Sequence, residues 1–112
     1  MKHIEAIIRS SQLDEVTEAL KELGITGITV SETRGFGRTG GRKDLYRGSA
    51  FVGDFMPKVM IEIVAADGLV ELILAAIQQS ARTGKIGDGK IFVSDVIEVV
   101  RIRTGERGEQ AV

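Results

Sequence analysis

The chain has no cysteine, no tryptophan and only one histidine, His3, among its 112 residues. The absence of cysteine excludes disulfide scaffolds, thiolate zinc sites, iron–sulfur clusters and cysteine nucleophiles. No His–carboxylate pair, zinc-binding set or nucleophile elbow is evident in the sequence. We therefore expect neither a metal site nor an enzyme active site.

Long apolar runs and a strong charge of either sign are also lacking. No stretch approaches the roughly 18 uncharged apolar residues of a membrane span, and the first residues do not resemble a signal peptide. We expect a cytoplasmic protein without direct membrane insertion, brought to a membrane only by a partner. A net charge of −1 and 4% aromatic residues argue against a nucleic-acid-binding module.

Glycine, in contrast, is abundant, with 14 residues in 112 against an average of about 7%. Most of the glycines fall within residues 35–53, 84–89 and 105–108. Residues 34–58 also carry six basic and two acidic side chains. This local excess is typical of a segment that binds anions or acidic surfaces, and a solvated loop is the alternative interpretation.

Regular apolar spacing between these segments predicts the secondary structure. Strands are expected at residues 3–8, 25–33, 58–64, 90–93 and 97–103, and helices at residues 13–23 and 69–77. We expect Ser11 and Asp14 to form a capping box for the first helix, Gly24 to end it and Asp67 to cap the second.

This order predicts an α+β, ferredoxin-like βαββαβ fold in a single domain, with a long loop between strands 2 and 3. Two helices can cover only one face of the sheet, yet the third strand is apolar on both of its faces. We therefore expect a homo-oligomer formed through the other face.

Residues 83–90 contain three glycines, whose backbone N–H groups can converge on one anion while Lys85 or Lys90 adds charge. A tight helix-to-strand turn is the alternative. Arg101 and Arg103, expected on a strand, would point to the same side and bind phosphate. Glu62 lies on an otherwise apolar strand, so we expect a guanidinium, a lysine or a ligand hydroxyl beside it.

Residues 83–92 and 101–112 resemble the two signatures of the PII family of nitrogen-regulatory signal-transduction proteins. Further matches at residues 4–8, 13–16, 35–38, 45–48 and 54–58 extend the resemblance to a single PII-like domain over residues 1–112. The resemblance implies a homotrimer with ATP or ADP bound between subunits. It also implies a T-loop at about residues 36–55, a B-loop at about 82–90 and a C-terminal loop at about 102–112.

The resemblance also implies which residues contact the nucleotide. Thr29 and Val64 would lie near the adenine, and Ile7 and Glu62 around the nucleoside. The phosphates and ribose would be surrounded by Gly37, Arg38, Gly87, Asp88, Gly89, Lys90, Arg101 and Arg103. The implied cofactors are ATP and ADP, and the need for Mg²⁺ is left open.

The sequence departs from the family where 2-oxoglutarate would bind. Members that sense this oxoacid have a glutamine after the Gly-Phe-Gly-Arg run, and this chain has Thr39, which cannot place the same oxygen ligand. Lys58, which pairs with the oxoacid in the family, remains. Thr39, Gly41 and Lys58 are thus the candidate co-ligand residues, and we expect weak or absent 2-oxoglutarate binding with adenine nucleotide binding retained.

A second departure concerns covalent regulation. The family's modified tyrosine corresponds to Phe51, and Ser49 matches a serine that is phosphorylated in cyanobacterial members, which makes Ser49 the candidate modification site.

The expected function is a PII-type regulator that controls an ammonium channel, transporter or nitrogen-metabolism enzyme through its T-loop. The alternative is a PII-like sensor of adenylate state for bicarbonate transport or carbon metabolism. An enzyme is not expected, although weak ATP hydrolysis by Lys90 and the arginines is left open.

Overall fold

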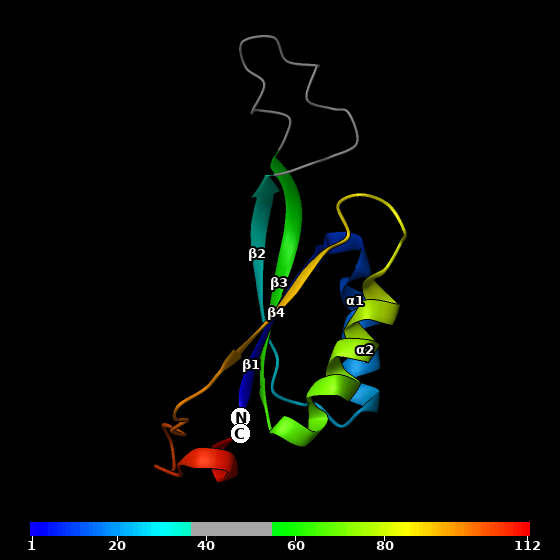
Figure 1. Cartoon of the computed structure of the whole chain (residues 1–112). Helices are drawn as coiled ribbons and strands as arrows, with labels where there is room; N and C mark the ends of the chain where they lie inside the picture. Colours follow the sequence, from blue (N-terminus) through cyan, green and yellow to red (C-terminus); the bar gives the residue numbers. More distant parts are fainter. Residues whose placement is uncertain (37–54) are drawn as a thin grey trace.

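The computed structural model describes residues 1–36 and 55–112 as a four-stranded antiparallel sheet with two helices on one face (Figure 1). The strands lie in the order β2-β3-β1-β4, and the predicted α+β, βαββαβ arrangement is confirmed. The elements are β1 (Lys2–Arg9), α1 (Leu13–Glu22), β2 (Thr29–Phe36), β3 (Phe55–Ala65), α2 (Val70–Ala81) and β4 (Gly89–Asp95). No helix in the described ranges is long and apolar enough to cross a membrane.

The core lies between the helices and one face of the sheet. Alternate residues of each strand point to the same face, so the central strands β1 and β3 bury every second side chain beneath the helices. The largest fully buried side chains are Ile4, Ile8, Val16, Leu20, Ile61, Ile73 and Ile77. These side chains come from β1, β3 and both helices, so one apolar layer holds the sheet and the helices together.

The opposite face, here called the open sheet face, has no helix of the described chain packed over it. The strand registers assign to it His3, Glu5, Ile7, Arg9, Thr29, Ser31, Thr33, Lys58, Met60, Glu62, Val64, Lys90, Phe92 and Ser94. Several of these residues are apolar, and Phe92 is 51% exposed. The expectation that helices cover only one face is therefore confirmed.

Neither predicted helix cap is formed. A short 3₁₀ turn precedes each helix, so Gln12 and Leu69 occupy the N-cap positions and no side chain makes a capping hydrogen bond. Asp67 instead accepts a hydrogen bond from the N-terminal ammonium at 2.9 Å. The predicted end of the first helix is confirmed, because Gly24 has a φ of +84° and its N–H donates to the carbonyl of Lys21.

Two strand predictions are also corrected. β2 begins at Thr29 rather than at residue 25, and β2 and β3 extend to Phe36 and Phe55, so the pair is longer than expected. Residues 97–103 form no strand beyond an isolated bridge between Val100 and Arg107. They lead into a turn in which the Gly105 N–H donates to the carbonyl of Arg101 at 2.7 Å.

Candidate functional site

The open sheet face brings together five of the residues predicted to bind nucleotide. Directly opposed residues form rows across the four strands, and one row contains Thr29, Glu62, Glu5 and Phe92. The next row contains Ser31, Met60, Ile7 and Lys90, and Val64 lies opposite His3 on the other side of the first row. Ile7, Thr29, Glu62, Val64 and Lys90 therefore share one continuous surface.

The B-loop (residues 82–90) links α2 to β4 at one end of this surface, and its glycines shape it. Gly84, Gly87 and Gly89 have φ values of +89°, +106° and +102°, which L-residues with side chains rarely adopt. A Cβ atom on Gly89 would also lie only 1.7 Å from the carbonyl oxygen of Ile7. The shape of the loop thus requires more than the single glycine that an ordinary tight turn needs.

Asp88 holds the B-loop in this shape. Its carboxylate accepts hydrogen bonds from the backbone N–H groups of Thr83 and Gly84 at 2.9 and 2.8 Å, from the Thr83 hydroxyl, and from Nε of Arg9 at 2.9 Å. The Thr83 hydroxyl, followed by the Arg9 guanidinium, holds the pKa of the Asp88 carboxyl well below its usual range. Asp88 is therefore an anion that organises the loop from within.

Arg9 and Lys58 form a cationic pair beneath the B-loop. Arg9 Nη2 donates to the carbonyl of Ile86 at 2.7 Å, and Lys58 Nζ donates to the carbonyl of Gly87. Burial, followed by repulsion from Arg9, lowers the pKa of Lys58. A cleft of about 370 Å³ is lined by Arg9, Ser10, Ser11, Met56, Pro57, Lys58, Ile86 and Gly87. Arg9 and Lys58 together outnumber the single Asp88 carboxylate that pairs with Arg9, and this excess of positive charge favours an anionic ligand.

Arg9 is the residue of this cleft that sequence reasoning missed. It is the last residue of β1 and lies opposite Lys58 of β3. Only the pairing of the two strands reveals this neighbour, because the residues are far apart in the sequence and Arg9 belongs to no glycine-rich motif.

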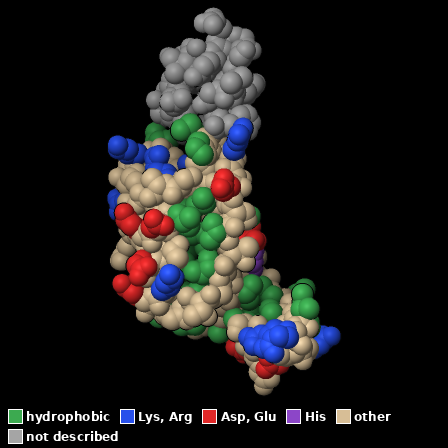
Figure 2. Space-filling view, turned by 180° about the vertical axis from the view of Figure 1, so that it is seen from behind, with side chains coloured by type: hydrophobic (Ala, Val, Ile, Leu, Met, Phe, Trp, Pro, Cys, Tyr) green, Lys and Arg blue, Asp and Glu red, His purple; other side chains and the backbone are tan. Residues whose placement is uncertain are grey.

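Arg101 and Arg103 lie far from the B-loop in the same chain. β4 leaves the B-loop beside Ile8 and ends opposite Lys2, and its seven residues span roughly 20 Å. The C-terminal segment consequently lies at the other end of the sheet, where it projects from the body and carries a group of basic side chains (Figures 1 and 2). The prediction that the two arginines align along a strand is wrong, since Arg103 lies in a turn and Arg101 pairs with Glu106 at 3.4 Å.

Glu62 has a different partner from those expected. His3 Nε2 lies 3.2 Å from Glu62 Oε1, and their side chains are 30% and 35% exposed. The expectation of a guanidinium, lysine or ligand hydroxyl did not include the histidine, and the fold contains a His–carboxylate pair that is not evident in the sequence. The two residues are 59 positions apart, so only the pairing of β1 with β3 brings them together.

The remaining candidate residues, Gly37, Arg38, Thr39, Gly41 and Ser49, lie outside the described residues, and their roles stay predictions.

Comparison with known proteins identifies the family. Residues 1–106 match the family model described as nitrogen regulatory protein P-II. Proteins of that name from Azospirillum brasilense, Rhodospirillum rubrum and Mesorhizobium japonicum are 63%, 61% and 61% identical to this chain over 112 residues, which is the full length of both chains in each case. The chain therefore belongs to the P-II family of nitrogen-regulatory signal-transduction proteins, as its two signature segments predicted.

Proposed function

We propose that this P-II protein is a cytoplasmic homotrimer that binds ATP or ADP between its subunits and controls a partner protein through its T-loop. The observation that carries the proposal is the separation of the predicted phosphate-binding groups. Lys90 and the B-loop lie at one end of the sheet and Arg101 and Arg103 at the other, so one chain cannot close both around the same phosphates. A second copy can supply the missing arginines.

The open sheet face supports the same arrangement. Ile7 and Val64 offer apolar contact for a base, and Thr29 and Glu62 lie opposite one another and offer a hydroxyl and a carboxylate for a nucleoside. A partly apolar face that no helix within residues 1–36 and 55–112 covers also favours association with further copies, which would place the nucleotide at the interface.

The position of the B-loop suggests how the nucleotide would act on the T-loop. Residues 37–54 connect the ends of β2 and β3, and those ends lie at the same end of the sheet as the B-loop (Figure 1). Lys58 spans the two regions, because its side chain lies against Gly35 of β2 while its Nζ donates to Gly87. ATP and ADP differ by one phosphate at this junction and would therefore favour different T-loop conformations.

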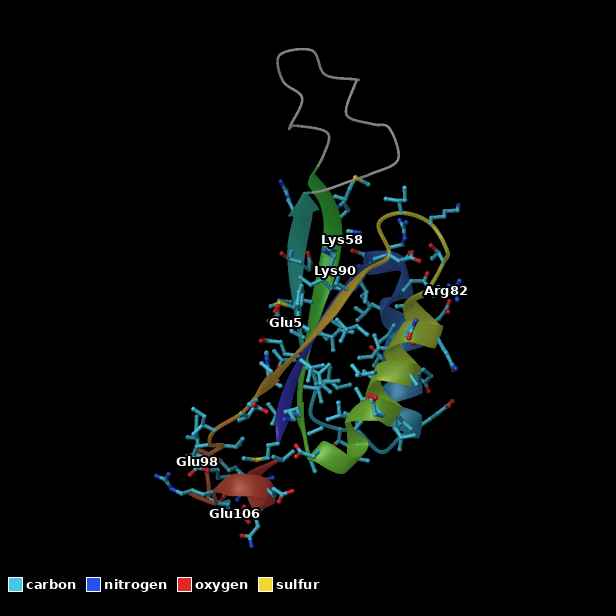
Figure 3. All side chains as sticks on the ribbon, in the orientation of Figure 1. Glu5, Lys58, Arg82, Lys90, Glu98 and Glu106 are labelled. Carbon is cyan, nitrogen blue, oxygen red and sulfur yellow. The ribbon has the colours of Figure 1, made fainter. Side chains whose placement is uncertain are left out.

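Titration calorimetry with ATP and ADP tests the nucleotide site. Lys90, labelled in Figure 3, is an exposed residue of the open sheet face. We expect Lys90→Ala to weaken ATP binding by about ten- to hundredfold, the effect of losing one charged hydrogen bond. Lys21→Ala removes the same charge from the exposed surface of α1 and should bind ATP as the parent does. Equal ATP affinity in both variants would exclude this site.

We further propose that 2-oxoglutarate is not an effective co-ligand. Arg9 and Lys58 still provide a cationic cleft for an anion, but Thr39 replaces the glutamine that helps to hold Mg²⁺ in members that sense the oxoacid. In the presence of MgATP, Thr39→Gln should raise the affinity for 2-oxoglutarate above that of the parent chain. Micromolar affinity in the parent chain would contradict the proposal.

Regulation, rather than catalysis, is the role that the family assignment supports. The T-loop partner would be an ammonium channel, a transporter or a metabolic enzyme, with Ser49 available for phosphorylation. A sensor of adenylate state in bicarbonate transport or carbon metabolism is the alternative, favoured by the loss of the oxoglutarate-associated glutamine. Equal affinity for the ammonium channel of the same organism in saturating ATP and in saturating ADP would contradict nucleotide-dependent control.

A further inference from the structure

We propose that His3, Glu5 and Glu62 form a binding site for a divalent transition-metal ion of the zinc type. One ligand atom from each residue lies within 4.8 Å of the other two, and all three side chains are partly buried on the open sheet face. His3 and Glu5 come from β1 and Glu62 from β3, so the site is built on two paired central strands.

The strand register supplies the first reason for a cation here. Glu5 and Glu62 are directly opposed in the β1–β3 pair, and like charges in directly opposed positions destabilise a sheet. In the described part of the chain, His3 is the only residue whose side chain forms a hydrogen bond or ion pair with either carboxylate, through Nε2 at 3.2 Å from Glu62 Oε1. Lys90 is the diagonal neighbour of Glu5 across β1 and β4, but no ion pair joins the two.

The donor set supplies the second reason and indicates the kind of ion. One imidazole nitrogen and two carboxylates suit zinc and similar divalent ions, which accept mixed nitrogen and oxygen ligands. Mg²⁺ and Ca²⁺ favour oxygen ligands throughout and are poorer matches to this set. Three protein ligands also leave a coordination position for water or for a group from another molecule.

The geometry needs only a small adjustment. Ligand atoms about 2.1 Å from zinc in a tetrahedral site lie roughly 3.4 Å apart. The His3–Glu62 distance of 3.2 Å already meets this separation, and the remaining distances are at most 4.8 Å. To complete a tetrahedral set, the Glu5 carboxylate would have to rotate closer to the other two ligand atoms.

The single histidine makes a direct test practical. In untagged, nitrogen-15-labelled protein without nucleotide, the imidazole signals belong to His3 alone. Adding Zn²⁺ should shift the Nε2 resonance and saturate at one equivalent per chain. Mg²⁺ at the same concentration should leave the resonance unchanged. Because nucleotide is absent, failure of this test does not bear on ATP binding, and failure of ATP binding does not bear on this test.

Matched variants separate the site from general charge effects. Glu5→Gln should weaken zinc binding by at least about tenfold, whereas Glu18→Gln, which removes the same charge from the exposed surface of α1, should not. If Glu5→Gln does not fold, Glu62→Gln provides the same measurement. Unchanged imidazole signals on adding Zn²⁺, or equal zinc affinity in the parent and the ligand variant, would overturn the proposal.

Discussion

Gly89 is the position at which the structure predicts the largest effect of adding a single methyl group. Its φ is +102°, and a Cβ atom there would lie 1.7 Å from the carbonyl oxygen of Ile7, where ordinary contact needs 3.4 Å or more. Gly84 is the matched control in the same loop, because its φ is +89° and a Cβ atom there would contact nothing within 4 Å. Comparing the two alanine variants separates backbone strain from steric overlap.

Backbone strain and steric overlap together determine how much each variant should lower the free energy of unfolding. A positive φ costs a non-glycine residue about 1–2 kcal/mol, and part of this is offset by the lower entropy of the unfolded variant. We therefore expect Gly84→Ala to lower the free energy of unfolding by about 1 kcal/mol. Gly89→Ala carries the same strain and must also separate β4 from β1, which breaks one or two ladder hydrogen bonds at about 1–3 kcal/mol each. Its total cost should be about 3–5 kcal/mol.

Urea denaturation followed by circular dichroism measures this difference. All samples must have the same protein concentration, because the stability of an oligomer depends on it. With a urea dependence of about 1.5 kcal/mol per molar, the midpoint should fall by about 0.7 M for Gly84→Ala and by 2 M or more for Gly89→Ala. Equal midpoints for the two variants would refute the close approach of the B-loop to β1.

Two further perturbations test the core and the loop. Ile61→Ala should cost about 2–5 kcal/mol in urea denaturation because Ile61 is fully buried, whereas Leu72→Ala, at a residue 55% exposed, should cost far less. A comparable loss of stability in both variants would contradict the placement of Ile61 in the core. Asp88 has a lowered pKa in the fold, so its stabilisation is complete above the ordinary value of 3.8 and is lost as the pH falls below it. Asp88→Asn should therefore have a lower free energy of unfolding than the parent at pH 7, and this difference should become smaller as the pH falls below 4. A difference that does not depend on pH would argue against stabilisation by the charge of the Asp88 carboxylate.

The sequence predicted the order of the elements well because that order depends on local apolar periodicity. The sequence shows the alternation of apolar residues along β1 and β3 and their helical spacing in α1, which includes Val16 and Leu20, and in α2, which includes Ile73. These apolar residues correspond to buried positions. The two helix caps were wrong because a 3₁₀ turn precedes each helix and moves the start of the helix past the expected capping side chain.

The candidate site was predicted only in part, for a related reason. Glycine-rich motifs identify the B-loop directly in the sequence, but contacts between strands do not appear there. Arg9 beside Lys58, and His3 beside Glu62, depend on the antiparallel register of β1 and β3. The strand expected for Arg101 and Arg103 was wrong because a short apolar run before a glycine also suits a turn, and the bridge from Val100 to Arg107 shows that the segment folds back on itself.

A subunit-mixing experiment tests the central claim, that one nucleotide site uses the B-loop of one chain and the C-terminal arginines of another. Lys90→Ala and Arg101→Ala chains are unfolded together, refolded as mixed trimers and titrated with ATP. Each variant alone should bind weakly, while random mixing should restore parent affinity at roughly a quarter of the sites, where neither substitution is present. A mixture that binds ATP no better than the separate variants would contradict a site shared between subunits.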